Sequence, residues 1–200
     1  EIYFLVADSH EAAKHSPHLE VFRKKGIEVL LLSDRIDEWL MQHLTDFDGK
    51  KLRSVAKGGL DLSKLDDEET KKAQEETEKQ FASVTERFKQ ALGEQVKDVK
   101  VSHRLTDSPA CVVTDEFDMS TQMIKLMESV GQKVPEQKPI FELNPEHALV
   151  KHIADVADED QFKQWADVLL EQALLSERGS LKNPASFVTR LNTLLLSLTK

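Results

Sequence analysis

Ile2-Tyr-Phe-Leu-Val6 and Ile27-Glu-Val-Leu-Leu-Leu32 are two short apolar runs near the start of the chain. Both are rich in β-formers and almost free of polar residues, as strands buried on both faces are. Between them, Ser9 is a favoured helix cap, and Gly26 is a residue that readily adopts the left-handed helix stop. Strand, helix and strand at this spacing predict a parallel βαβ unit.

A second helix follows, with Ser33 or Asp34 as its cap and Phe47-Asp-Gly49 as its end. Its helical spacing predicts an inner apolar face, which consists of Ile36, Leu40, His43 and Leu44. Residues 52–56 can form a third strand. The Gly-marked segment from Gly58 to Asp66 is the best candidate for a domain boundary. We therefore expect domains at residues 1–66 and 67–200.

The second domain is predicted to be mostly helical α+β. Charged residues dominate the helix predicted over 67–92, whose apolar positions are concentrated in its second half. Period-two or apolar runs predict short strands at 96–101, 110–114 and 141–143. Helical spacing predicts further helices at 118–130, from 145, at 159–178 and at 184–198. The whole chain is thus expected to be α/β followed by α+β.

Composition narrows the function classes. The chain has a net charge of −9, with 40% hydrophobic and 32% charged residues, and no basic run interleaved with aromatics. This argues against nucleic acid and anionic membranes as partners. The apolar runs at 27–32 and 194–198 are too short to span a bilayer. A single cysteine, Cys111, suits a reducing compartment, so we expect a cytoplasmic location.

No catalytic or metal-ligating constellation stands out. His10 and His15 are five residues apart, which places their rings about 140° apart on a helix and prevents them from sharing a metal. His18 adds one more possible ligand, but a small metal-dependent enzyme that uses His10, His15 and His18 is the least favoured alternative. Cys111 lies in an apolar strand and is expected to pack rather than react. We therefore expect neither catalytic residues nor a metal.

The segment Asp118-Met-Ser-Thr-Gln-Met-Ile-Lys-Leu-Met-Glu-Ser-Val130 holds three of the four methionines. On a helix with about 100° per residue, one stripe contains Met119, Met123, Leu126 and Met127. Methionine side chains adapt to surfaces of varied shape, so the stripe could bind different partners. The same spacing is equally typical of a core-facing stripe, and both readings stay open.

Two other features suggest binding surfaces. Trp39 lies at the edge of its predicted helix face, beside Glu38, and an aromatic next to a carboxylate is common at contact surfaces. The last two helices carry wide apolar arcs. If these arcs met a second copy, a C2 four-helix bundle would form. The expected interface residues are Phe162, Trp165, Leu169, Leu170, Phe187, Leu191, Leu194, Leu195 and Leu198.

Several stretches, in one order along the chain, resemble the ninety-kilodalton heat-shock (HSP90) chaperone family. They are Ser16-Pro-His-Leu-Glu20, Asp34-Arg-Ile-Asp-Glu-Trp39, His103-Arg-Leu-Thr-Asp-Ser-Pro109 and Leu143-Asn-Pro-Glu-His147. The resemblance implies that residues 1–66 are the last α/β part of the middle domain and that the rest is the C-terminal dimerisation domain. It also implies a stress-response protein that assists folding.

The resemblance further implies that the ATP-binding domain is absent from this fragment. On this reading the chain is not itself an enzyme and holds no cofactor, whereas ATP and Mg bind elsewhere in full-length relatives. The family's client-binding positions fall on Glu38, Trp39, Met119, Met123, Leu126 and Met127. The implied partners are a second copy, non-native client proteins and other chaperones. The alternative is a purely structural dimerisation module with the methionine helix as core.

Overall fold

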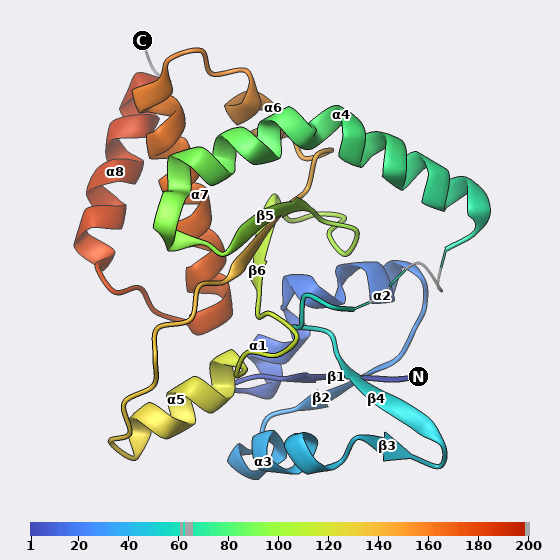
Figure 1. Cartoon of the computed structure of the whole chain (residues 1–200). Helices are drawn as coiled ribbons and strands as arrows, with labels where there is room; N and C mark the ends of the chain where they lie inside the picture. Colours follow the sequence, from blue (N-terminus) through green and yellow to red (C-terminus); the bar gives the residue numbers. More distant parts are fainter. Residues whose placement is uncertain (61, 63–65, 199–200) are drawn as a thin grey trace.

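The computed structural model describes residues 1–60, 62 and 66–198 (Figure 1). The first sheet has the strand order β2-β1-β4-β3. It comprises β1 (Ile2–Val6), β2 (Val29–Leu32), β3 (Asp46–Phe47) and β4 (Lys50–Ser54). β1 is central and runs parallel to β2 and β4, with Phe4 opposite Leu30 and Ser54. The expected βαβ unit is present.

One face of this sheet is covered by α1 (His10–Lys14), η1 (Pro17–Leu19) and α2 (Glu20–Lys24). The predicted helix is broken at Pro17, which starts the short 3-10 turn. Gly26 ends α2 with φ +66°, a conformation that glycine adopts without steric cost. A core forms between sheet and helices from Tyr3, Leu5, Ala13, Leu19, Val21, Phe22 and Val55.

The expected orientation of α3 (Arg35–His43) is wrong. Ile36 and Leu40, assigned to the inner face, are 71% and 49% exposed, and His43 is also exposed. Glu38, on the opposite side of the helix, is buried instead. Helical periodicity shows which residues share a face but not which face the protein covers, and here the less apolar face turns inward.

The second sheet has the order β5-β7-β6, from β5 (Asp98–Val101), β6 (Ala110–Val113) and β7 (Ile140–Leu143). β7 pairs in parallel with β5 and antiparallel with β6. The five helices of this part are α4 (Glu68–Leu92), α5 (Thr121–Ser129), α6 (Ala148–Ala154), α7 (Glu159–Arg178) and α8 (Pro184–Ser197).

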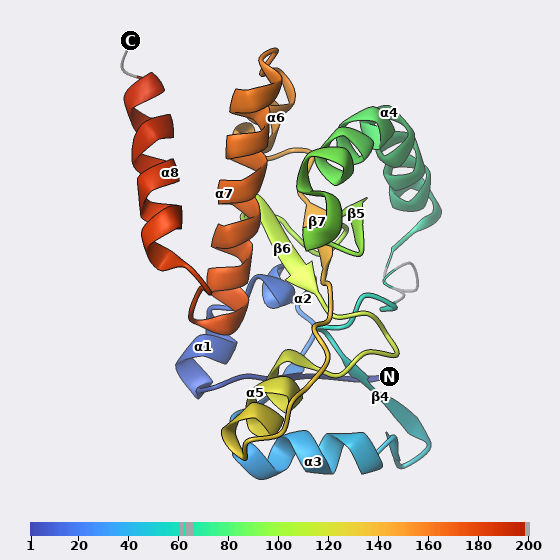
Figure 2. The same ribbon diagram turned by 60° about the vertical axis from the view of Figure 1, so that its left-hand side comes forward.

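The main core lies between this sheet and the helices α4, α6, α7 and α8 (Figure 2). Its largest fully buried side chains are Phe88, Phe141 and Phe162, and the Phe88 and Phe162 rings meet edge to face at 4.9 Å. α8 packs along α7, so the expected terminal helix pair is present within one chain. The proposed boundary at residue 66 borders residues 61 and 63–65, which lie outside the described residues.

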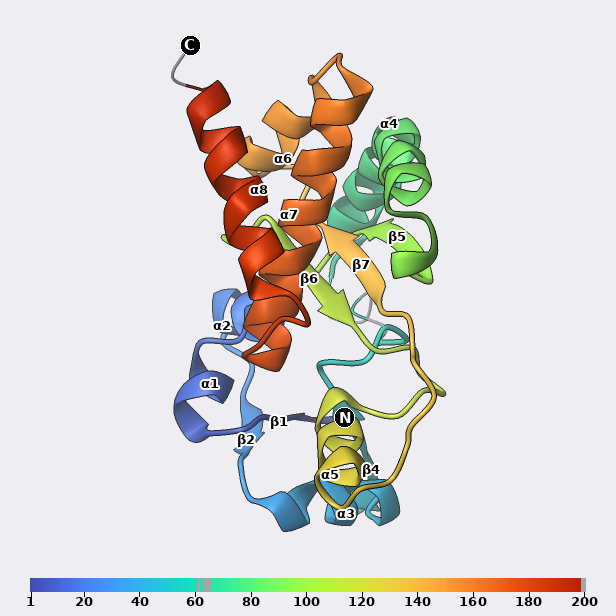
Figure 3. The same ribbon diagram turned by 90° about the vertical axis from the view of Figure 1, so that its left-hand side faces the viewer.

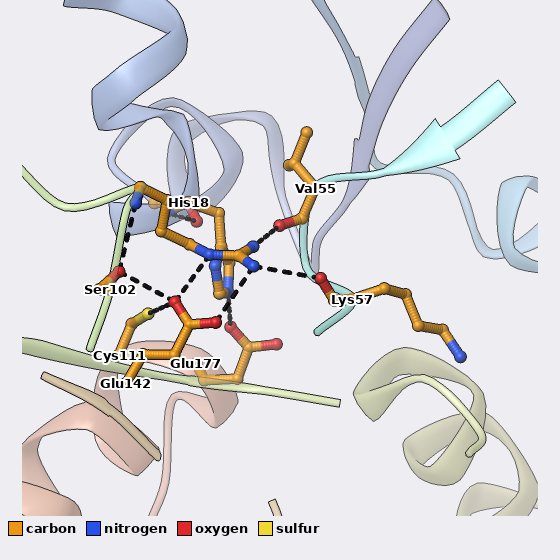
Figure 4. A network of polar contacts seen from close by, with 9 residues as sticks. His18, Val55, Lys57, Ser102, Cys111, Glu142 and Glu177 are labelled. Atoms are coloured by element: carbon orange, nitrogen blue, oxygen red, sulfur yellow. Dashed lines mark hydrogen bonds and ion pairs between the residues drawn. The ribbon is translucent and has the colours of Figure 1, made fainter. Parts of the chain in front are cut away.

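A buried polar network joins the first sheet region to the second (Figure 4). Arg104 is 3% exposed and forms an ion pair with Glu142, from Nε to Oε2 at 2.9 Å and from Nη2 to Oε1 at 3.2 Å. The same guanidinium donates to the carbonyls of Val55 and Lys57, which follow β4. Buried charges are tolerated when paired and hydrogen-bonded in this way.

Two further carboxylates also link the first sheet region to the second. Glu20 accepts hydrogen bonds from the backbone N–H groups of 106–108 and from the Ser108 hydroxyl. Burial tends to raise the pKa of Glu20, but these hydrogen bonds outweigh it and hold the pKa below its usual value. Glu177 of α7 lies 3.0 Å from His18 Nε2, and this contact likewise lowers the pKa of Glu177 against the opposing effect of burial.

Candidate functional site

α5 lies beside α3, on the side of the molecule away from α4, α6 and α8 (Figure 3). The Ser120 hydroxyl accepts a hydrogen bond from Met123 N at 3.0 Å and so caps the first turn of α5. The same hydroxyl donates to Glu38 Oε1 on α3. At the outer end, Lys125 pairs with Asp8, which follows β1. Polar contacts therefore fix the position of α5 against the first sheet region.

The loop before α5 is held by one lysine. Lys57 Nζ donates to the backbone carbonyls of Asp115 at 3.3 Å and Glu116 at 3.1 Å, and also to that of Asp118. Partial burial lowers the pKa of Lys57, although nearby carboxylates oppose the change. The lysine is thus a structural tether.

Large apolar side chains remain uncovered next to this tethered region. Trp39 is 47% exposed and Met119 is 40% exposed, whereas Leu126 and Met127 are half-buried. We call these four residues the α3–α5 surface. A hollow of about 340 Å3 lies between the two helices, with Glu38 and Arg35 on one wall and Lys125 and Leu126 on the other. Charged and polar side chains make up most of the lining of this hollow, and Leu126 is the one residue of the α3–α5 surface among them. Exposed tryptophan and methionine side chains suit apolar ligands of varied shape.

The structure removes two expected residues from the exposed surface. Met123 is 3% exposed and Glu38 is 8% exposed, so neither presents its side chain to a visiting chain. Met123 lies at the centre of the methionine stripe, and the stripe packs onto the protein with only its margins left open. Glu38 is covered because its carboxylate meets Ser120 at the start of α5. The Met123 side chain is therefore buried within its own chain.

The residues expected in the dimer interface also differ in how exposed they are. Five of these residues are buried in the core of their own chain, so these side chains are not available to a partner: Phe162, Trp165, Leu169, Leu170 and Leu194. Phe187 and Leu191 are half-buried against the same core. Leu195 and Leu198 are 50% and 56% exposed. Val188 and Leu196, which are not among the expected interface residues, are also exposed, at 51% and 65%.

The histidines are not arranged as a metal site. His18, a possible metal ligand by sequence, is 1% exposed and contacts Glu177. Across the part of the chain that the structure describes, no group of three or more His, Cys, Asp or Glu side chains could hold a metal ion. Cys111 is buried, and burial raises the pKa of its thiol well above the usual value.

Membrane insertion finds no support either. Among the helices of the described residues, none combines the length and the apolar character needed to cross a bilayer.

Comparison with known proteins identifies the family. The family model described as "Hsp90 protein" matches residues 1–200. The chain belongs to the HSP90 family. It is 68% identical to the chaperone protein HtpG of Pseudoalteromonas translucida and 70% identical to that of Colwellia psychrerythraea, each over all 200 residues of this chain and 31% of the relative. HtpG of Psychromonas ingrahamii is 62% identical over 98% of the chain and 31% of its own length. The chain thus spans about a third of these HSP90 relatives.

These matches correct three expectations. We expected a dimerisation and client-binding fragment without the ATPase domain, a chain that is not an enzyme, and no cofactor. The family model covers all 200 residues, and the same residues are similar to chaperone protein HtpG of two bacteria. The matches therefore give no ground for placing this chain outside the ATP chemistry of the family. The three expectations therefore do not stand. The resemblance to the HSP90 family itself, and the chaperone assignment, are confirmed.

Proposed function

We propose that this chain takes part in an HSP90-type chaperone by holding segments of non-native proteins on the α3–α5 surface. The observation that carries the proposal is that Trp39 and Met119 stay 47% and 40% exposed on elements that polar contacts fix in place. A preformed apolar surface binds without first having to order itself. Non-native chains expose the apolar side chains that such a surface would cover.

The whole protein is proposed to act as an ATP-dependent homodimer in the bacterial cytoplasm. Support comes from relatives named chaperone protein HtpG in several bacteria. For pairing, α8 offers Val188, Leu195, Leu196 and Leu198, four side chains about half exposed. An intersubunit four-helix bundle built from α7 and α8 of two copies is the arrangement that covers them.

The binding surface is tested by replacing Met119 and Leu126 with serine. Partly exposed side chains of this size contribute about 1 kcal/mol each when a ligand covers them, so the double variant should bind about 30-fold more weakly. The measurement is fluorescence anisotropy with labelled, reduced and carboxymethylated α-lactalbumin, an unfolded probe, with and without Mg-ATP.

Two further variants make the test specific. Leu175→Ser on α7 removes a side chain that is also 40% exposed but lies on another element, and it should leave the affinity within twofold. Met123→Ser should instead destabilise the fold by about 2–5 kcal/mol, as core truncations do. Equal affinities for wild type and the Met119/Leu126 variant would remove the α3–α5 surface from the function.

A further inference from the structure

Phe117 is the most exposed large hydrophobic side chain among the described residues, at 92%. It lies in the loop between β6 and α5, beside the α3–α5 surface. Single apolar residues on a protein surface are ordinary and need no explanation. The setting of Phe117 is different in two respects, which are the rigidity of its loop and the charge around it.

The loop is anchored from several sides. Phe117 N donates to Asp115 Oδ1 at 3.2 Å, and Asp118 N donates to Asp115 O at 3.2 Å, which closes a tight turn. Lys57 Nζ binds three carbonyls of the same turn. Lys57 also forms a β-bridge with Thr114, and Gly58 N donates to Thr114 O at 2.8 Å. The ring is therefore held out by an ordered backbone.

The backbone of Phe117 lies close to the start of α5. Ser120 follows three residues later and contacts Glu38, the neighbour of Trp39. Three residues span at most about 10 Å, so Phe117 lies within that distance of the junction between α3 and α5. Met119 is nearer still. An extended polypeptide segment covers such a distance with about three residues, at about 3.3 Å per residue.

The charge around Phe117 is negative. Asp115, Glu116, Asp118 and Glu38 all lie within electrostatic reach of Lys57. Lys97, which is paired with Asp115 at 2.9 Å, and Lys100, whose charge also acts on Asp115, are the further cations of this group. Four carboxylates against three ammonium groups leave an excess of one negative charge. A positive ligand is favoured at such a surface, and the preference weakens as salt is added.

We propose that Phe117 is a further binding residue of the α3–α5 surface, and that with its neighbouring carboxylates it selects polypeptide segments in which an apolar residue adjoins lysine or arginine. The inference rests on the proposed function and names the class of client segment. The occupant is a non-native polypeptide. The ring covers the apolar residue, and the carboxylates attract the cation beside it.

The test uses two labelled peptides of 20 residues that share the same spacing of leucine and phenylalanine. One carries lysines next to the apolar positions, and the other carries glutamates there. The wild-type chain should bind the lysine peptide about tenfold more tightly, and the ratio should shrink in high salt. Phe117→Ser should weaken binding of the lysine peptide about fivefold.

Matched variants show whether Phe117 itself is responsible for the loss of peptide binding. Phe47→Ser removes another exposed phenylalanine, 65% exposed on β3, and should change affinity less than twofold. Lys57→Gln frees the loop, so it should weaken binding in the wild-type chain but not when Phe117 is already serine. Equal effects of Phe117→Ser and Phe47→Ser, or equal binding of both peptides, would overturn the proposal. So would an effect of Phe117→Ser on self-association alone.

Failure of this inference is distinguishable from failure of the proposed function. If the Met119/Leu126 variant loses binding while Phe117→Ser does not, the α3–α5 surface stands and Phe117 is no part of it. If Phe117→Ser loses binding while the Met119/Leu126 variant does not, the ligand rests on the loop and the proposed surface is wrong.

Discussion

Arg104→Met is expected to lower the free energy of unfolding by about 3–5 kcal/mol, the cost of breaking a buried ion pair by removing one partner. The Glu142 carboxylate would lose both of its arginine hydrogen bonds while it stays inside the protein. The carbonyls of Val55 and Lys57 would lose their donor as well. Urea unfolding followed by circular dichroism measures the change.

The control for Arg104 is Lys151→Met, which breaks an exposed ion pair with Glu146 at 2.8 Å. Exposed pairs contribute at most about 1 kcal/mol. The double variant Arg104→Met, Glu142→Met should recover part of the loss, since it leaves no buried charge unpaired. If Arg104→Met costs no more than Lys151→Met, the network does not hold the two sheet regions together.

Leu195→Asp with Leu198→Asp is expected to raise the dimer dissociation constant at least about 100-fold. Four half-exposed side chains from each of two copies give eight, and at about 1 kcal/mol each their burial yields roughly 8 kcal/mol. This gain is similar in size to the estimated association cost of about 4–15 kcal/mol, so pairing should be sensitive to a charge placed on the apolar face of α8. Sedimentation equilibrium measures the dissociation constant.

The matched change for α8 is Thr193→Asp, which adds the same charge to an exposed position about 160° around the helix from Leu195. It should leave the association unchanged within about threefold. A wild-type chain that stays monomeric at high micromolar concentration would contradict pairing through α8. Equal effects of Thr193→Asp and the leucine variants would show that net charge, rather than the apolar face, governs association.

Much of the fold could be predicted from local pattern. The apolar runs at 2–6 and 29–32 form the predicted parallel pair, and Gly26 and Gly179 stop their helices in left-handed conformations. The short antiparallel partner β3 was missed, because its two residues, Asp46 and Phe47, show no alternating pattern.

The candidate site was less predictable, since its features depend on contacts between distant residues. His18 meets Glu177 across 159 positions, and Arg104 meets Glu142 across 38. No local pattern carries such pairings. The exposed side of α3 and the buried position of Met123 depend on the same long-range packing, because periodicity defines a stripe but not what covers it. Phe117 falls outside any periodic element, which is why it was not selected.

Photo-crosslinking tests the central claim most directly. A benzophenone amino acid replaces Met119 in one protein and Leu175 in another, two positions with equal exposure on different elements. Each protein is irradiated with labelled, carboxymethylated α-lactalbumin. The account predicts a strong adduct from position 119 that an excess of unlabelled probe suppresses, and little adduct from position 175. Adducts of equal yield from both positions, or none from position 119, would contradict it.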